Sequence, residues 1–139
     1  MTYTTKNSLD SNFKSGESDF IRKAMKQALL TKEDEQQLTR AWKHNRDSKA
    51  LDRLIRAYSR LAVSSALKYK KFGLPVSDLI QEANVGLMQA ADKFDPDRDV
   101  RFSTYSAWWI KAAIQEYILR NWSMAVSYTH LTLPTTPYV

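Results

Sequence analysis

The sequence contains no cysteine, and it has two histidines among its 139 residues. The lack of thiols excludes disulfide bonds, thiolate catalysis and cysteine-based zinc sites. The histidines, His44 and His130, lie far apart in the chain, and no HExxH, GxSxG or glycine-rich phosphate-binding motif is present. We therefore expect neither an enzyme with catalytic residues nor a protein with a cofactor or metal site.

Long apolar runs are absent as well. No stretch approaches the roughly 18 apolar residues that indicate a membrane span, and the N-terminal segment has no signal-peptide apolar core. We therefore expect a cytoplasmic protein without a membrane partner. The chain has three glycines and few β-rich stretches, which favours an all-α protein, and its net charge of +6 favours a polyanionic partner.

Helical periodicity begins near Phe20, where apolar residues are spaced for a short amphipathic helix that should end near Leu30. Thr31 is then placed to cap a second helix. A third and longer helix should begin at Asp47 or Ser48. Its apolar positions share one broad face, which comprises Leu51, Leu54, Ile55, Tyr58, Leu61, Ala62, Ala66 and Tyr69.

Gly73 is placed to end the third helix in the left-handed conformation. After Leu74 and Pro75, Ser77 can cap a fourth helix over residues 78–94. With a fifth helix after residue 103, these segments predict an all-α fold. We expect a compact bundle of about five helices with a mobile N-terminal tail and an irregular C-terminal tail.

The two ends of the chain differ in composition from its middle. Residues 1–17 are rich in Ser, Thr and Asn and predict a flexible tail. Residues 123–139 contain no Asp, Glu, Lys or Arg, include two prolines and show no helical period. We expect this segment not to continue the preceding helix and to be foreign to the domain, as a frameshift, a splice-like junction or read-through into adapter sequence would make it. The folded domain should span 18–122.

The fifth helix carries the densest group of aromatic residues. We predict that it runs from about Thr104 to about Trp122, with Ser103 as its N-cap. Its core stripe should comprise Ser106, Ile110, Ala113, Ile114, Tyr117 and Ile118. Trp108 lies off that stripe and lines up with Thr104, Lys111 and Gln115, while Tyr105 and Trp109 flank it.

Cations interleaved with flat rings and amide groups suit nucleic acid. The cations meet phosphates, the rings stack on unpaired bases, and Gln and Thr can hydrogen-bond base edges. The alternative is that Tyr105 and Trp109 belong to the core and that Lys111 is merely solvated. The pattern alone indicates a class of chemistry and leaves both interpretations open.

Two other helix faces carry charge of one sign. The third helix presents a basic face, which is either solvated or follows phosphates: Arg53, Arg56, Arg60, Lys68, Lys70 and Lys71. Between Leu74 and Asp92 there are three acids and no base. Such a helix repels DNA and suits a protein partner with Arg or Lys, although an ordinary solvated face is the alternative.

Alternating carboxylates at Asp95, Asp97 and Asp99 could be mistaken for a calcium site. No glycine stands at the sixth position from Asp95 and no glutamate at the twelfth, so the rest of an EF-hand loop is missing. We therefore interpret this segment as a turn that leads into the aromatic helix.

The motifs DLIQE, N-x-GLM, KF, FSTY and WWI occur in register between Asp78 and Ile110. With these motifs, the chain from about Leu30 to Trp122 resembles regions 1.2 and 2, the promoter-recognition domain, of bacterial sigma factors of the sigma-seventy family. IQEYILRNW and KFGLP are most similar to the heat-shock branch. The resemblance implies a non-enzymatic factor that binds core RNA polymerase and promoter DNA.

The resemblance also implies roles for particular residues. The residues that would dock on the coiled-coil clamp of the polymerase's largest subunit are Asp78, Gln81, Glu82, Asn84 and Met88. The residues that would melt the minus-ten element and hold its non-template strand are Phe102, Thr104, Tyr105, Trp108 and Trp109. Lys111 and Gln115 would contact the upstream edge of that element. Arg98 and Arg101, with the basic face of the third helix, would meet phosphates.

Three departures from the family pattern matter. Ala83 stands where the family usually has Gly, which should be tolerated in a helix. Ala112 stands where housekeeping members carry a base-contacting Gln, so the promoter sequence should differ. The resemblance stops at Trp122, and we expect a chain truncated after the minus-ten-binding domain. Truncation makes one rival function plausible, a module that occupies the clamp without opening DNA. A second rival is a generic RNA- or single-strand-binding helical domain.

Overall fold

The computed structural model describes the backbone of residues 16–128 and the side chains of residues 16–122. Within that range the chain is helical and contains no strand, which confirms the predicted all-α fold. The elements are a helix over 16–25, α2 (Lys32–Asn45), α3 (Ser48–Lys68), the short 3-10 helix η1 (Lys70–Phe72), α4 (Val76–Lys93) and α5 (Phe102–Tyr128). None of these helices is long and apolar enough to cross a membrane.

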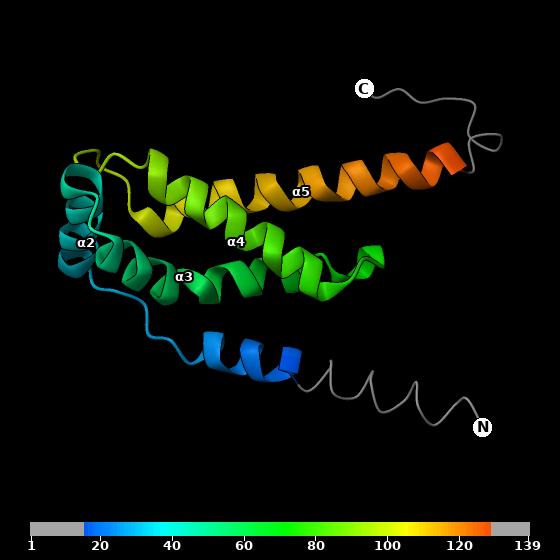
Figure 1. Cartoon of the computed structure of the whole chain (residues 1–139), viewed down its shortest axis with the longest axis horizontal. Helices are drawn as coiled ribbons and strands as arrows, with labels where there is room; N and C mark the ends of the chain where they lie inside the picture. The colour runs from blue at the N-terminus through cyan, green and yellow to red at the C-terminus, as the bar shows by residue number, and fades with distance from the viewer. Residues whose placement is uncertain (1–15, 129–139) are drawn as a thin grey trace.

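The centre of the molecule is an antiparallel hairpin of α4 and α5 that packs on α3 (Figure 1). Helix α2 crosses one end of these helices and contacts α3. The helix over 16–25 lies along α3 in Figure 1 and places Ala24 in the common core. One face of α5 is therefore buried against α4 and α3, and the other is left at the surface.

Several predicted helix boundaries are confirmed. The Thr31 hydroxyl accepts a hydrogen bond from the Asp34 backbone N–H at 3.2 Å, and the Asp47 carboxylate accepts one from the Lys49 N–H at 3.0 Å. These side chains satisfy backbone donors that the first turns of α2 and α3 leave unpaired. Gly73 adopts the predicted left-handed conformation with φ of 80°, although it ends η1 rather than α3 itself.

The predicted caps of the fourth and fifth helices are wrong. Helix α4 begins at Val76, so Ser77 lies inside its first turn, and the Pro75 carbonyl accepts hydrogen bonds from the Asp78 and Leu79 N–H groups at 3.1 and 3.2 Å. Helix α5 begins at Phe102, so Ser103 is likewise helical. In both cases the helix begins two residues earlier than the cap-forming side chain indicated.

Two predicted helix ends are also corrected. The first helix ends at residue 25 rather than near residue 30, and residues 16–17 are helical, so the predicted flexible tail 1–17 is too long. Its remainder, 1–15, lies outside the described residues. Helix α5 continues to Tyr128 instead of ending at Trp122, because residues 123–128 contain neither Gly nor Pro and each further residue adds one helical hydrogen bond. Residues 129–139 lie outside the described part of the chain.

The core sits between α3, α4 and α5. Its fully buried side chains include Leu54, Tyr58, Leu79, Leu87 and Phe102. The predicted core stripe of α5 is confirmed at Ser106, Ile110, Ile114 and Ile118, which are buried, whereas Ala113 and Tyr117 are half-buried.

Gly86 sets the spacing of the central hairpin. A Cβ atom at this position would lie 2.7 Å from the Trp109 carbonyl oxygen and 2.9 Å from the Ile110 Cα. Helices α4 and α5 therefore approach backbone to backbone, which only glycine permits. This close contact fixes the position of the α5 residues on either side of it, among them the aromatic residues.

Candidate nucleic-acid interface

The outward side of α5 presents the residues that helical phasing placed there. Thr104, Trp108, Lys111 and Gln115 are all exposed, and 62% of Trp108 is accessible to solvent. We call these four residues the α5 face. An indole so far outside the core contributes little to packing. The alternative that Tyr105 and Trp109 belong to the core holds only in part, because both are half-buried against it.

Tyr105 and Trp109 form a half-buried layer beneath the α5 face. The Tyr105 ring lies 5.3 Å from the Phe94 ring and 6.2 Å from the Trp109 ring, measured between centroids. Its hydroxyl donates to the Lys93 carbonyl at 3.3 Å, and the Lys93 ammonium lies 5.8 Å from the Trp109 ring centre. These contacts fix the two rings, so the layer is a rigid support that still reaches the surface.

A surface hollow of about 260 Å³ opens beside Trp108; we call it the aromatic pocket. Its walls come from the end of α4, the following loop and the first turns of α5: Lys93, Phe94, Asp95, Arg98, Val100, Tyr105 and Trp108. Rings can stack on a flat unpaired base, and a carboxylate can accept hydrogen bonds from an exocyclic amine. The cations at the rim can pair with phosphates.

Phe102 does not belong to this surface. None of it is exposed, and its ring makes edge contacts with Tyr58 and Phe94 at centroid distances of 5.1 and 5.3 Å. The expectation that its side chain faces DNA is therefore corrected: Phe102 packs beneath Phe94, a wall of the pocket. The backbone carbonyl of the preceding residue, Arg101, accepts a hydrogen bond from the Tyr105 N–H and so begins the helix.

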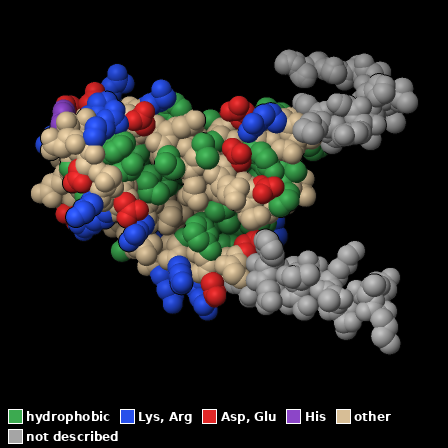
Figure 2. Space-filling view, viewed as in Figure 1, with side chains coloured by type: hydrophobic (Ala, Val, Ile, Leu, Met, Phe, Trp, Pro, Cys, Tyr) green, Lys and Arg blue, Asp and Glu red, His purple; other side chains and the backbone are tan. Residues whose placement is uncertain are grey.

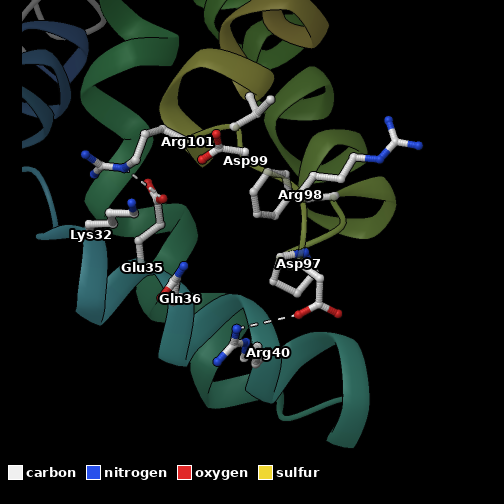
Figure 3. Close-up of a pocket in the computed structure, with 11 residues that line it drawn as sticks. Lys32, Glu35, Gln36, Arg40, Asp97, Arg98, Asp99 and Arg101 are labelled. Atoms are coloured by element: carbon white, nitrogen blue, oxygen red, sulfur yellow. Dashed lines mark hydrogen bonds and ion pairs between the residues drawn. The ribbon is translucent and has the colours of Figure 1, made fainter.

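The Arg101 guanidinium is already engaged inside the protein. Its Nε donates to the Glu35 carboxylate at 3.0 Å, and its Nη2 donates to the Leu30 carbonyl at 3.3 Å. The hydrogen bond that Arg101 donates to Glu35 raises the pKa of Arg101. Only 42% of its side chain is exposed. Arg101 thus ties α2 to the start of α5 rather than projecting freely toward phosphates, as Figure 3 shows.

Glu35 is the functional neighbour that sequence reasoning missed. It is 3% exposed, and its two carboxylate oxygens accept from Arg101 and from the Tyr58 hydroxyl. Burial, followed by the hydrogen bond to Glu35, raises the pKa of Tyr58. In the sequence Glu35 is one of several acids in the first turn of α2, and no local signal distinguishes it from its solvated neighbours.

A second hollow, of about 240 Å³, lies between α2 and the loop before α5 (Figure 3). Arg40 of α2 pairs with Asp97 across it at 3.5 Å. Arg98 lines both hollows, is exposed, and points away from α2 in Figure 3. Of the two predicted phosphate contacts in this segment, Arg98 is the more exposed: 80% of its side chain is accessible against 42% for Arg101, and its Nε lies 3.9 Å from the Asp95 carboxylate. Within the described residues, no group of carboxylates and histidines is arranged to hold a metal.

The far end of the α5 face meets the end of α3. The Gln115 side-chain amide donates to the Tyr69 hydroxyl at 3.2 Å, and the Tyr69 ring stacks on Phe72 at 6.0 Å.

The predicted basic face of α3 lies at the surface. Its residues Arg53, Arg56 and Arg60 are exposed, and Arg56 pairs with Asp52 at 3.0 Å. Figure 2 shows Lys and Arg gathered over the α2 end and along the first helix.

The acidic helix α4 presents its predicted docking residues on a different face of the hairpin. Gln81 and Met88 are exposed, and Asp78, Glu82 and Asn84 are half-buried. Val85, which sequence analysis did not single out, lies one turn from each of the two exposed residues and is 47% exposed. We call Asp78, Gln81, Glu82, Val85 and Met88 the α4 face, which combines carboxylates, an amide and apolar side chains.

Both carboxylates of the α4 face have partners on α5. The Tyr117 hydroxyl donates to Asp78 at 2.9 Å, and Arg120 lies 3.7 Å from Glu82. Burial, followed by the hydrogen bond to Asp78, raises the pKa of Tyr117. Helix α5 therefore contributes to both surfaces: its aromatic half forms the nucleic-acid candidate, and its later turns support the acidic one.

Comparison with known proteins identifies the family to which the chain belongs. The family described as Sigma-70 region 2 matches residues 54–124. The chain is 50% identical over 96 residues to RNA polymerase sigma factor RpoH of Zymomonas mobilis, covering 69% of this chain and 32% of that protein. It is 42% identical over 109 residues to RNA polymerase sigma factor RpoH of Caulobacter vibrioides, covering 78% and 37%.

A further relative is RNA polymerase sigma-C factor of Myxococcus xanthus, which is 44% identical over 107 residues, covering 77% of this chain and 36% of that protein. The chain spans about a third of the length of these curated relatives. The matched segment includes α4 and the part of α5 that carries the α5 face.

Proposed function

The chain belongs to the sigma-70 family through its region 2, and on that premise we propose that it binds core RNA polymerase and recognises and opens the promoter minus-ten element. Its similarity to RpoH proteins, at 42–50% identity, supports a role of the heat-shock type. We propose that residues 18–122 are the functional unit and that it acts as a non-enzymatic factor, with binding energy as the source of DNA opening.

The observation that carries this proposal is the exposed Trp108 beside the aromatic pocket. Extruding a base from a duplex costs a few kcal/mol, and each aromatic ring that stacks on a base returns about 1–3 kcal/mol. Trp108 at the rim and Tyr105 in the wall supply such rings. We propose that they hold an unpaired base of the non-template strand, and that Trp108 together with Trp109, whose ring adjoins Tyr105, separates the strands at the upstream end of the opened segment.

The charges around the aromatic pocket favour a strand that passes along α5. Lys93 and Arg98 border the pocket, and Lys111 follows along the helix. Their charges suit the phosphates of the strand. Thr104 and Gln115 offer hydrogen-bonding groups at the two ends of the α5 face, and we assign Lys111 and Gln115 to the upstream edge of the element. Phe102 supports the pocket from the core, and Arg101 contributes through the start of α5.

We assign polymerase docking to the α4 face together with Asn84. A partner with Arg or Lys would meet Asp78 and Glu82, and its apolar groups would cover Val85 and Met88, which are 47% and 53% exposed. Interfaces of this kind combine an apolar centre with polar contacts around it. We propose that the partner is the clamp coiled coil of the largest polymerase subunit.

The test is fluorescence anisotropy of a labelled non-template minus-ten oligonucleotide, with a scrambled oligonucleotide as control, in the presence and absence of core polymerase. We expect selective binding that requires polymerase. Trp108→Ala should weaken it by about 5- to 150-fold, corresponding to the loss of one stacking contact of about 1–3 kcal/mol.

Trp122→Ala is the matched control, because Trp122 is another exposed indole on α5, 57% accessible, outside the aromatic pocket. It should leave oligonucleotide binding unchanged. Equal binding of both oligonucleotides without polymerase would instead favour a generic single-strand-binding domain. Polymerase binding with no strand capture would favour the module that occupies the clamp without opening DNA.

A further inference from the structure

The two carboxylates of the α4 face are occupied in the free chain by groups from α5. Tyr117 donates a hydrogen bond to Asp78 at 2.9 Å, and the Arg120 guanidinium lies 3.7 Å from the Glu82 carboxylate. The antiparallel pairing of α4 and α5 brings these residues together, since positions 117 and 120 return past the first turns of α4 (Figure 1).

The two partners differ in their electrostatic effect. A tyrosine hydroxyl orients a carboxylate while leaving its negative charge in place. A guanidinium supplies a positive charge, as an Arg or Lys of a docking protein would. The chain therefore leaves one acid of the α4 face charged and oriented, and it partly neutralises the other.

The Glu82–Arg120 pair is poorly placed to stabilise the fold. The side chains are 28% and 61% exposed, and their charged atoms are 3.7 Å apart, which is longer than a good hydrogen bond. Exposed pairs of this kind contribute little to folding. The backbone contact at Gly86 and the buried isoleucines of α5 already hold the two helices together.

We propose that Arg120 is an internal substitute for the partner's cation: it pairs with Glu82 in the free chain and is displaced by an Arg or Lys of the polymerase on docking. This inference rests on the proposed docking role of the α4 face. Docking then exchanges one ion pair of Glu82 for another. The contribution of Glu82 to the free energy of binding is therefore only the difference between the free energies of the two ion pairs.

Removing an ordinary interface residue weakens binding, whereas the proposed exchange predicts the opposite for Arg120. Removing Arg120 leaves Glu82 fully charged and open, so the affinity for core polymerase should rise. An exposed pair of this strength corresponds to about a two- to fivefold change. The increase should be largest at low salt and should fade as salt screens the charges.

The experiment measures the affinity of the full labelled chain for core polymerase, without DNA, for the parent and for Arg120→Gln. We expect about two- to fivefold tighter binding by Arg120→Gln, whereas Arg120→Lys should stay near the parent. Lys43→Gln on α2 loses the same charge far from the α4 face and should not tighten binding. Thermal unfolding of each variant shows whether the fold is retained.

A double-mutant cycle with Glu82→Gln distinguishes this role from a general effect of charge. In the Glu82→Gln background, removal of Arg120 should no longer raise the affinity. Weaker or unchanged binding by Arg120→Gln overturns the proposal, as does an increase that persists without Glu82.

The docking role itself is tested separately with Gln81→Ala and Met88→Ala. If these variants bind polymerase as the parent does, the docking proposal fails. If they weaken binding while Arg120→Gln does not strengthen it, the docking role stands and the Arg120 proposal is overturned.

Discussion

Replacing Gly86 with alanine tests the backbone contact on which the placement of the aromatic residues depends. The added Cβ would lie 2.7 Å from the Trp109 carbonyl oxygen, 2.9 Å from the Ile110 Cα and 3.0 Å from the Ala113 Cβ. These atoms belong to the backbone or are fixed directly to it. No change of rotamer can relieve the contact, so α4 and α5 must move apart.

Two opposing effects set the change in stability that Gly86→Ala causes. Alanine is more favourable than glycine inside a helix by about 1 kcal/mol, whereas overpacking a buried site costs about 1–3 kcal/mol and occasionally more. Because two of the three distances are below 3.0 Å and involve backbone atoms, we expect the steric cost to win. A steric cost in the upper half of that range, about 2–3 kcal/mol, less the gain of about 1 kcal/mol, lowers the free energy of unfolding by about 1–2 kcal/mol.

Thermal unfolding followed by circular dichroism measures this change, and Tm should fall by roughly 3–10 °C for a domain of this size. Val85→Ala is the control, because the neighbouring Val85 is 47% exposed and its truncation leaves the hairpin contact intact. A Gly86→Ala variant as stable as the parent, or more stable, would refute the argument that the two backbones are in contact.

Two further predictions concern the hydrogen bonds that Tyr58 and Arg101 donate to the buried Glu35 carboxylate. Glu35→Gln removes the charged acceptor shared by Arg101 and Tyr58, so the free energy of unfolding should fall by about 1–3 kcal/mol; an unchanged urea midpoint would contradict this. Tyr58→Phe should also destabilise the protein near pH 7. The raised pKa of folded Tyr58 means that the parent loses stability as pH rises above the ordinary tyrosine value of about 10. The difference in free energy of unfolding between parent and variant should therefore narrow in urea titrations at alkaline pH. A difference that stays constant with pH would contradict the burial of the Tyr58 hydroxyl in a hydrogen bond.

The features that the sequence predicted well depend on local geometry. Thr31 and Asp47 form caps with backbone groups two or three residues away, so their spacing alone identifies them. The stripe of buried residues on α5 and the exposed position of Trp108 both follow from the 3.6-residue period of a helix.

The features that could not be predicted depend on contacts between distant segments. Phe102 lies in a motif implied to face DNA, yet its ring is enclosed by Tyr58 from the middle of α3 and Phe94 from the end of α4. Glu35 and Arg101 are 66 residues apart, and nothing in either neighbourhood indicates that they pair. The attachment of Arg120 to Glu82 likewise requires the antiparallel packing of two helices.

The extent of α5 was missed for a different reason. The composition of residues 123–128 differs from that of the preceding chain, but the segment contains no residue that stops a helix, so α5 continues. A change of composition is therefore a weaker indicator of a helix end than a Gly or Pro at the boundary.

The central claim is that Trp108 and the aromatic pocket hold an opened strand, and permanganate reactivity of thymines in a duplex minus-ten fragment tests it most directly. With core polymerase and the parent chain, we predict reactive thymines confined to the element. With Trp108→Ala, the complex should form and the thymines should stay protected. Equal reactivity with the variant, or protected thymines in a complex of the parent chain, would contradict the account.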